Sequence, residues 1–236
     1  MPGLRNEPPM NDSARDAVLE ISGLRFRYAD HDEAQGDWTV RVDRLTVDRG
    51  EQVLLTAGSG RGKSTLLYLI AGLMDPAEGE VKVDGVNIHA LRGAARDHHR
   101  GRAIGMIFQT FNLLHGFTAI ENVMAAMMFS TIPAKEHTAR AAALLGRLGI
   151  ERIEADADRL SVGQQQRVAV ARAVACGPGL VLADEPTASL DPENAATAIK
   201  VIQDACRGIG AALVCVSHDP SMRDRFEKRL SLDELG

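Results

Sequence analysis

Residues 57–65 read "AGSGRGKST" and directly follow the apolar run "QVLLT" at 52–56. Glycines, a lysine and hydroxyl residues between a buried strand and a helix are typical of a phosphate-binding loop, with Ala57 in place of its usual first glycine. The glycines let backbone N–H groups turn toward a polyphosphate, and the N-terminus of the following helix faces the same anion. The stretch therefore predicts a phosphate site where strand becomes helix.

The residue types of this loop assign roles to individual side chains. Lys63 is expected to contact the β- and γ-phosphates, and Ser64 to ligate Mg²⁺. The loop residues expected to contact the nucleotide are Gly58, Ser59, Gly60, Arg61, Gly62, Lys63, Ser64 and Thr65. A glycine-rich turn without a ligand is the simple alternative, and the strand before it and the helix after it argue against that alternative.

Composition limits the function classes. The 236 residues are 45% hydrophobic and 25% charged, which suits one soluble globular domain. A net charge of −5 argues against a nucleic-acid partner. Three widely spaced cysteines, Cys176, Cys206 and Cys215, indicate neither a disulfide framework nor a zinc site. No apolar run is long enough to span a bilayer, so a membrane role would need another chain.

The order of patterns predicts an α/β fold. Residues 1–17 are polar and Pro-rich and are expected to be a disordered tail. The remaining 18–236 read as a single domain, with a mostly parallel sheet, a small antiparallel β part and a helical insert. The core is expected at about 18–90 and 166–233, and the helical part at about 91–165.

Local signals refine this prediction. A hairpin or strand pair is expected around Asp84-Gly85. A helix with a capping box is expected to begin at Thr118, because Glu121 follows three residues later. The pair His98-His99 has no recognisable metal-ligand spacing and is expected to be solvated surface.

Two adjacent acids follow another apolar run, in "GLVLADEP" at 179–186. Ligands of open α/β sheets collect at the carboxyl ends of the strands. Asp184 is therefore expected to hold Mg²⁺, directly or through water, and Glu185 to activate the attacking water as a general base. A plain helix cap is the alternative, and it is weak beside a phosphate-binding loop.

A second anion-binding helix end is predicted in "LSVGQQQRVAVARAV" at 160–174. Ser161 is a helix cap, and Gln164 lies three residues later, so the helix that follows has free N–H groups at its start. One complete phosphate-binding loop is already present. A second such element makes sense if it serves the nucleotide bound by another copy of the chain.

With these motifs in order, residues 18–233 resemble an ABC-type ATPase, the nucleotide-binding subunit of a transporter. The resemblance implies a P-loop NTPase fold with a RecA-like core, and it implies ATP and Mg²⁺ as cofactors. It also implies that Tyr28 stacks on adenine, that Gln109 links Mg²⁺ to a transmembrane permease, and that Asp191 lies at a subunit contact. Ser161, Gly163 and Gln164 would then meet the γ-phosphate across a head-to-tail homodimer, and His218 would contact the same phosphate. The catalytic set implied is Glu185, His218, Lys63 and Gln109, and the metal set is Ser64, Gln109 and Asp184.

The chain departs from the family pattern at Val162, where glycine is usual. A β-branched residue there adds bulk beside the phosphate, so slower hydrolysis is conceivable. Within the superfamily the motifs look most like the branch of macrolide-exporter, lipoprotein-release and cell-division ATPases. Met124, Met127, Met128 and Phe129 could be core residues or a pliant groove for a permease helix.

The resemblance thus implies an ATP-hydrolysing subunit that powers an export or lipoprotein-release transporter, from the cytoplasmic face of the membrane, through a permease. Two alternatives stay open. One is a regulatory or mechanical ATPase of a cell-division type complex that moves no solute. The other is a soluble, non-transport ABC ATPase, for whose usual coiled coils or zinc modules 236 residues leave no room. The signature helix argues against GTPase and kinase functions.

Overall fold

The computed structural model describes residues 16–28, 38–58, 62–188 and 190–236. Residues 1–15 of the predicted disordered tail lie outside the described residues. Strand β1 (Ala17–Phe26) begins one residue before position 18, the predicted start of the domain. Three residues of the predicted phosphate-binding loop, Ser59, Gly60 and Arg61, also lie outside the described residues. Within the described part, no helix combines the length and apolar character needed to cross a membrane.

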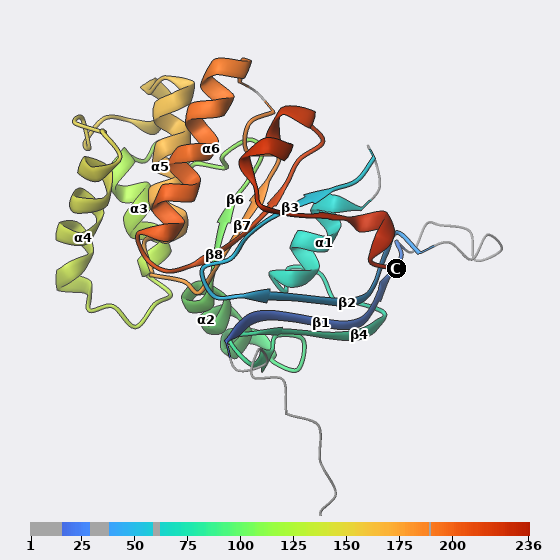
Figure 1. Ribbon diagram of the computed structural model, residues 1–236. Helices are drawn as coiled ribbons and strands as arrows, with labels where there is room; N and C mark the ends of the chain where they lie inside the picture. The colour runs from blue at the N-terminus through green and yellow to red at the C-terminus, as the bar shows by residue number, and fades with distance from the viewer. Residues whose placement is uncertain (1–15, 29–37, 59–61, 189) are drawn as a thin grey trace, which may run out of the picture.

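A parallel sheet of five strands forms the centre of the molecule (Figure 1). Its order is β6-β7-β8-β3-β9, and every neighbouring pair is parallel. The strands are β3 (Gln52–Thr56), β6 (Ile104–Ile107), β7 (Leu180–Asp184), β8 (Ala212–Val216) and β9 (Lys228–Ser231). The predicted α/β class with a mostly parallel sheet is confirmed.

A second, antiparallel sheet has the order β2-β1-β4-β5. Besides β1, it contains β2 (Val40–Asp48), β4 (Glu78–Val83) and β5 (Val86–Asn87). The turn between β4 and β5 has positive φ at Asp84 (49°) and Gly85 (73°), as a tight hairpin of this kind requires. The predicted hairpin at Asp84-Gly85 is therefore confirmed.

Helix α1 (Lys63–Ile70) lies between the two sheets, and a second group of helices covers the opposite face of the parallel sheet (Figure 1). That group contains α3 (Ala119–Met127), α4 (Ala134–Arg147), α5 (Val162–Val174) and α6 (Pro192–Arg207). The remaining helices are α2 (Gly93–Ala103) and the short 3-10 turns η3 (Ala157–Arg159), η4 (Pro220–Arg225) and η5 (Leu232–Glu234). The range predicted for the helical part, 91–165, also holds β6, which pairs with β7 in the parallel sheet.

The parallel sheet separates two apolar cores. Successive side chains of a strand point to opposite faces, so Val53 and Leu55 of β3 pack with α1 and the antiparallel sheet, whereas Leu54 packs with α3 to α6. Both faces are covered, which explains why the strands of this sheet read as continuous apolar runs rather than as alternating patterns.

One prediction about the surface is wrong. His98 is exposed, but His99 is only 7% exposed, and its Nε2 donates a hydrogen bond to the carbonyl oxygen of Val83 at 3.1 Å. The reason is that α2 packs beside β4, so one face of this very polar helix is covered. Sequence patterning around two adjacent histidines did not show which one faces the sheet.

Candidate functional site

The carboxyl ends of the parallel strands bring the predicted site residues to one edge of the sheet. Ala57 and Gly58 follow β3, Gln109 follows β6, Asp184 ends β7 with Glu185 directly after it, and His218 follows β8. All of these strands run in the same direction. This edge is where open α/β sheets place their ligands.

The start of α1 has the geometry predicted for a phosphate-binding helix end. The helix begins at Lys63, as expected, and its N-cap Gly62 has φ 76° and offers no side-chain cap to the first N–H groups. A Cβ at Gly62 would lie 2.4 Å from the carbonyl oxygen of Thr39, so only glycine fits there. The first N–H groups of α1 therefore stay available to an anion.

Ser64 and Asp184 meet although 120 residues separate them. The Ser64 hydroxyl donates to Oδ1 of Asp184 at 3.0 Å, and Asp184 is only 4% exposed. Burial raises the pKa of Asp184, and the Glu185 carboxylate acts in the same direction, whereas the Ser64 hydrogen bond and Lys63 oppose it.

Oxygen ligands of this kind suit Mg²⁺, which takes one or two protein oxygens and completes its shell with water and phosphate. Across the described residues, no group of three or more His, Cys, Asp and Glu side chains could hold a metal ion by itself. The Ser64–Asp184 pair therefore fits a metal that arrives with a nucleotide better than a permanent metal site.

The buried carboxylate should cost stability when no nucleotide is bound. Because its pKa is raised, the folded protein holds this proton more tightly than the unfolded chain, so ionisation destabilises the fold as pH rises above 3.8, the ordinary value. We expect Asp184→Asn, which can still accept from Ser64, to raise the melting temperature at pH 7 by about 2–4 °C, or about 1 kcal/mol.

The measurement is thermal unfolding without nucleotide or Mg²⁺, repeated at lower pH, where the difference from wild type should shrink. Asp219→Asn is the control of opposite sign, because hydrogen bonds from Ser221 lower the pKa of Asp219. An Asp184→Asn protein that melts below wild type at pH 7 would contradict this account of the site.

Glu185 is held by three groups of the site. Its Oε1 accepts from Nδ1 of His218 at 2.7 Å, its Oε2 accepts from the backbone N–H of His218 at 3.3 Å, and Nζ of Lys63 lies 3.8 Å from Oε1. The backbone of Glu185 has φ 44°, a conformation that non-glycine residues rarely adopt. The carboxylate of Glu185 is therefore held in a fixed position beside Lys63 and His218.

Lys63 is already positioned toward the loop. Its ammonium donates to the carbonyl oxygens of Ala57 at 3.1 Å and Gly58 at 3.0 Å. Together with Glu185, these contacts hold the positive charge of Lys63 beside the loop, where the phosphates of a nucleotide are expected.

Tyr28 and Gln109 lie at the borders of the site. The hydroxyl of Tyr28 is 2.9 Å from that of Thr65 on α1, and its ring packs edge-on against Phe26 with centroids 5.0 Å apart. Tyr28 remains 42% exposed. Gln109 is exposed and follows the end of β6, where Ile107 pairs with Ala183, the residue before Asp184.

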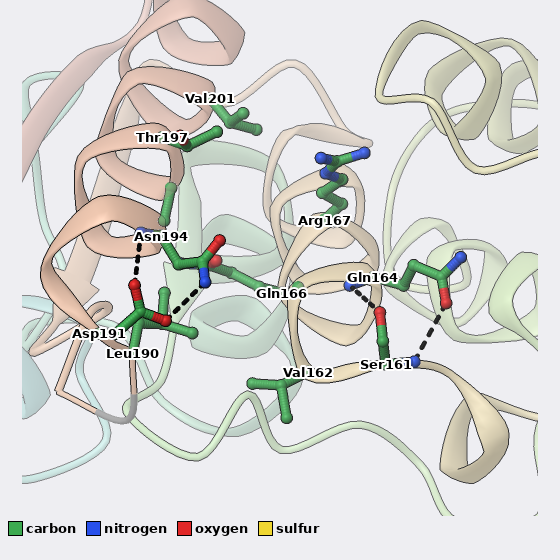
Figure 2. Close-up of a pocket in the computed structure, with 12 residues that line it drawn as sticks. Ser161, Val162, Gln164, Gln166, Arg167, Leu190, Asp191, Asn194, Thr197 and Val201 are labelled. Atoms are coloured by element: carbon green, nitrogen blue, oxygen red, sulfur yellow. Dashed lines mark hydrogen bonds between the residues drawn. The ribbon is translucent and has the colours of Figure 1, made fainter.

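The second predicted element, the capped start of a helix, forms as expected and borders a cavity of its own. Ser161 caps α5 in a complete capping box with Gln164, with hydrogen bonds of 3.3 and 3.0 Å (Figure 2). This helix end borders a cavity of about 580 Å³ between the starts of α5 and α6. None of the residues of the Lys63–Asp184–Glu185 site lines that cavity.

Asp191, expected at a subunit contact, lies on the other side of the same cavity. It caps α6, where its carboxylate accepts from the backbone N–H and from the side-chain amide of Asn194 (Figure 2). The starts of two helices thus face one opening. Val162, at the first position of α5, takes helical backbone angles and is 49% exposed, so its bulk points outward rather than into the fold.

Three features of the site were not predicted from sequence. They are the Tyr28–Thr65 contact, the bond from Nε2 of Gln166 to the carbonyl oxygen of Pro186 at 2.9 Å, and the bonds of Arg172 to the segment after Gln109. Each joins residues at least 20 positions apart. No local pattern signals such pairs.

Comparison with known proteins agrees with this geometry. The family model described as "ABC transporter" matches residues 40–188. Lipoprotein-releasing system ATP-binding proteins LolD are similar over nearly the whole chain. The LolD of Rhodopseudomonas palustris (strain BisB5) is 40% identical, covering 95% of this chain and 97% of its own. That of Anaeromyxobacter dehalogenans is 44% identical, covering 91% and 90%.

Solved structures show the same fold. The dimeric post-hydrolysis state of the ATP-binding cassette MJ0796, bound to ADP and Pi, aligns with a TM-score of 0.78 at 30% identity and covers 90% of this chain and 93% of its own. The cbiO1 protein from Clostridium perfringens, part of the ABC transporter complex cbiONQ, aligns with a TM-score of 0.74 at 27% identity, covering 87% and 80%. With its phosphate-binding loop, its paired acids and its capped signature helix all inside the matched region, the chain belongs to the ABC transporter family, among its ATP-binding subunits.

Proposed function

We propose that this chain is the ATP-binding and ATP-hydrolysing subunit of a lipoprotein-releasing ABC system, and that it works as a head-to-tail dimer. The observation that carries the proposal is the separation of the two anion-binding elements. None of the residues of the Lys63 site lines the cavity at the Ser161 helix end, so within one chain the two elements do not face the same opening, and a second copy can bring one onto the other. The LolD relatives, which align over nearly their full length, support lipoprotein release as the task.

Gly163 supports the dimer independently. It lies inside α5 without positive φ, and a Cβ added there would meet nothing within 4 Å. The fold of one chain therefore does not need a glycine at this position, where glycine weakens the helix. A residue without a side chain is useful here if a phosphate approaches the helix start from outside.

The roles in one composite site follow from the positions. Residues 58–65, which include Lys63, would bind the phosphates. Tyr28 would offer its exposed ring to adenine. Ser64, Asp184 and Gln109 would hold Mg²⁺ directly or through water, and this ion would neutralise charge on the phosphates. Glu185 would take the proton of the attacking water, and His218 would hold the γ-phosphate. Ser161, Gly163 and Gln164 of the second copy would close the site. Asp191 would lie at the contact between the two copies.

Loss of the γ-phosphate removes the charge that both copies contact, so ADP should hold the dimer poorly. Closing and opening would then move a permease seated near Gln109, on the cytoplasmic face of the membrane. Phe129 (59% exposed) and Met128 (73% exposed) offer apolar contacts to such a partner, and Phe129 borders a cavity of about 450 Å³ together with Met106 and Cys176. Met127 is fully buried and belongs to the core.

A glycine substitution tests the dimer. Gly163→Ala should stabilise α5 by up to about 1 kcal/mol, because alanine is the better helix former. It should nevertheless abolish ATP-dependent dimerisation, since the added methyl group meets the phosphate. The measurements are thermal unfolding, binding of ATP to the monomer, and light scattering with saturating ATP in a Glu185→Gln background.

Gly146→Ala is the matched control. Gly146 also lies inside a helix, α4, without positive φ, and a Cβ added there would likewise meet nothing within 4 Å. It should give a similar gain in stability and leave dimerisation unchanged. A Gly163→Ala protein that dimerises like wild type would remove the signature helix from the nucleotide site.

Lipoprotein release is tested with the permease that copurifies with the chain. The complex is reconstituted in vesicles loaded with an acylated lipoprotein, and ATP-dependent release is followed. We expect release of the lipoprotein to require ATP and to disappear with Glu185→Gln. ATP hydrolysis without release of lipoprotein would leave the ATPase assignment intact and favour a regulatory or mechanical role.

A further inference from the structure

Helix α5 contacts three functional segments of the chain. Its first residue follows Ser161, the cap at the dimer surface. Its middle is bonded to the turn that follows Glu185, and its last turn is bonded to the segment that follows Gln109. The two inner contacts are made by Gln166 and Arg172, neither of which has a role in nucleotide binding or hydrolysis.

Arg172 binds the backbone after Gln109 with both arms of its guanidinium. Nη2 donates to the carbonyl oxygen of Phe111 and Nη1 to that of Asn112, both at 2.6 Å. Phe111 (φ 59°) and Asn112 (φ 46°) both have left-handed backbone, which residues other than glycine rarely adopt. The surroundings must therefore hold this turn in place, and Arg172 is the group that ties it to α5.

The environment of Arg172 is unusual for a structural arginine. It is half-buried, and desolvation lowers its pKa. Within the described part of the chain it forms no ion pair, so carbonyl oxygens alone satisfy its charge. A half-buried charge without a counter-ion contributes little to stability. The planar fork is, however, well suited to fix two neighbouring carbonyl groups at once.

Gln166 makes the second contact. Its side chain is 4% exposed, and its Nε2 donates to the carbonyl oxygen of Pro186 at 2.9 Å. Pro186 directly follows Glu185, whose carboxylate is the proposed general base. Gln166 and Arg172 lie six positions apart on one helix of 13 residues, so both contacts are fixed to the same rigid element.

We propose that Gln166 and Arg172 are positioning residues that fasten the Gln109 segment and the Glu185 turn to α5, so that permease docking near Gln109 is transmitted to the general base and to the dimer surface. A shift of the Gln109 segment pulls on Arg172 and moves α5 as a unit. Gln166 then carries this movement to the Glu185 turn. The inference rests on the proposed function, because it assumes that a permease docks beside Gln109.

The test compares the ATPase rate of the complex with that of the isolated subunit, expressed as a stimulation ratio. Arg172→Lys keeps the charge but loses the fork, and Gln166→Met keeps the volume but loses the donor. Both should lower the ratio at least tenfold, while affinity for the permease changes less than about threefold. Arg140→Lys is the matched control, because Arg140 donates to the carbonyl oxygen of Ala175 at 2.6 Å and contacts neither segment. It should keep the wild-type ratio.

Arg172 borders the same cavity as Phe129, so affinity must be measured separately. Gln166 does not border that cavity, and its variant separates transmission from docking. Wild-type ratios in both variants, or a loss explained by weaker permease binding, would overturn the proposal. A lower stimulation ratio in Arg172→Lys but not in Gln166→Met would also overturn the proposal, because α5 would then not transmit permease docking to the Glu185 turn.

Hydrogen exchange on the wild-type complex gives a second readout that needs no variant. Permease binding should change the protection of residues 108–113 and of the first turn of α5 together. A change confined to 108–113 would contradict the proposal. If the wild-type subunit neither hydrolyses ATP nor is stimulated by the permease, the proposed function itself fails, and this result is distinct from every outcome above.

Discussion

Glu185→Gln is expected to bind ATP, to form a stable dimer and to lose about 100- to 10,000-fold of the turnover rate, the usual contribution of a general base. The substitution keeps the size of the side chain, and the amide oxygen can still accept a hydrogen bond from His218. The backbone at Glu185 stays fixed, because its N–H donates to the carbonyl oxygen of Val216 at 3.0 Å. What disappears is the capacity to take a proton from water.

The measurements are phosphate release, equilibrium binding of ATP, and light scattering with saturating ATP. Glu227→Gln, at an exposed carboxylate before β9, is the control and should match wild type in all three. Turnover close to wild type in Glu185→Gln would assign the proton to another group. A variant that stays monomeric with ATP would instead count against the sandwiched dimer.

Lys63→Ala should weaken ATP binding about 10- to 100-fold, since a hydrogen bond to a charged group is worth about 1.5–3 kcal/mol. The Lys63 ammonium lies at the loop, bonded to Ala57 and Gly58 and 3.8 Å from Glu185. Little rearrangement is needed for the ammonium to contact the β- and γ-phosphates. Its removal should therefore mainly lower the affinity for ATP.

Titration with a fluorescent ATP analogue measures this effect, and circular dichroism verifies that the variant is folded. Lys200→Ala is the control, because Lys200 is exposed on α6 and away from the sheet edge. It should bind like wild type. Unchanged affinity in Lys63→Ala would contradict the assignment of residues 57–65 as the nucleotide loop.

Features that depend on neighbouring residues were predictable from the sequence. The start of α1 at Lys63, the hairpin at Asp84-Gly85 and the capping boxes at Thr118 and Ser161 all follow from contiguous patterns. Each is confirmed because turn and cap chemistry is decided within a few residues. The acids at the end of β7 were predictable for the same reason.

Contacts between distant segments were not predictable in this way. The burial of His99 depends on the packing of α2 beside β4, and the surrounding run of charged residues hides it. The bonds of Gln166 and Arg172 depend on where α5 lies against two loops that are 20 and 61 residues away in sequence. Periodicity shows that a helix has a covered face, but not which loop covers it.

The sequence by itself determined which residues carry the proposed chemistry: a loop for phosphates, oxygen ligands for magnesium, a carboxylate proposed as general base, and a capped helix end. Only the tertiary structure decided how they combine. The strand order β6-β7-β8-β3-β9 sets Ser64 3.0 Å from Asp184 and His218 2.7 Å from Glu185. The Ser161 helix end borders a different cavity, which none of these four residues lines. The reason is physical: local hydrogen bonding fixes loops and caps, whereas the packing of covered faces fixes which of them meet.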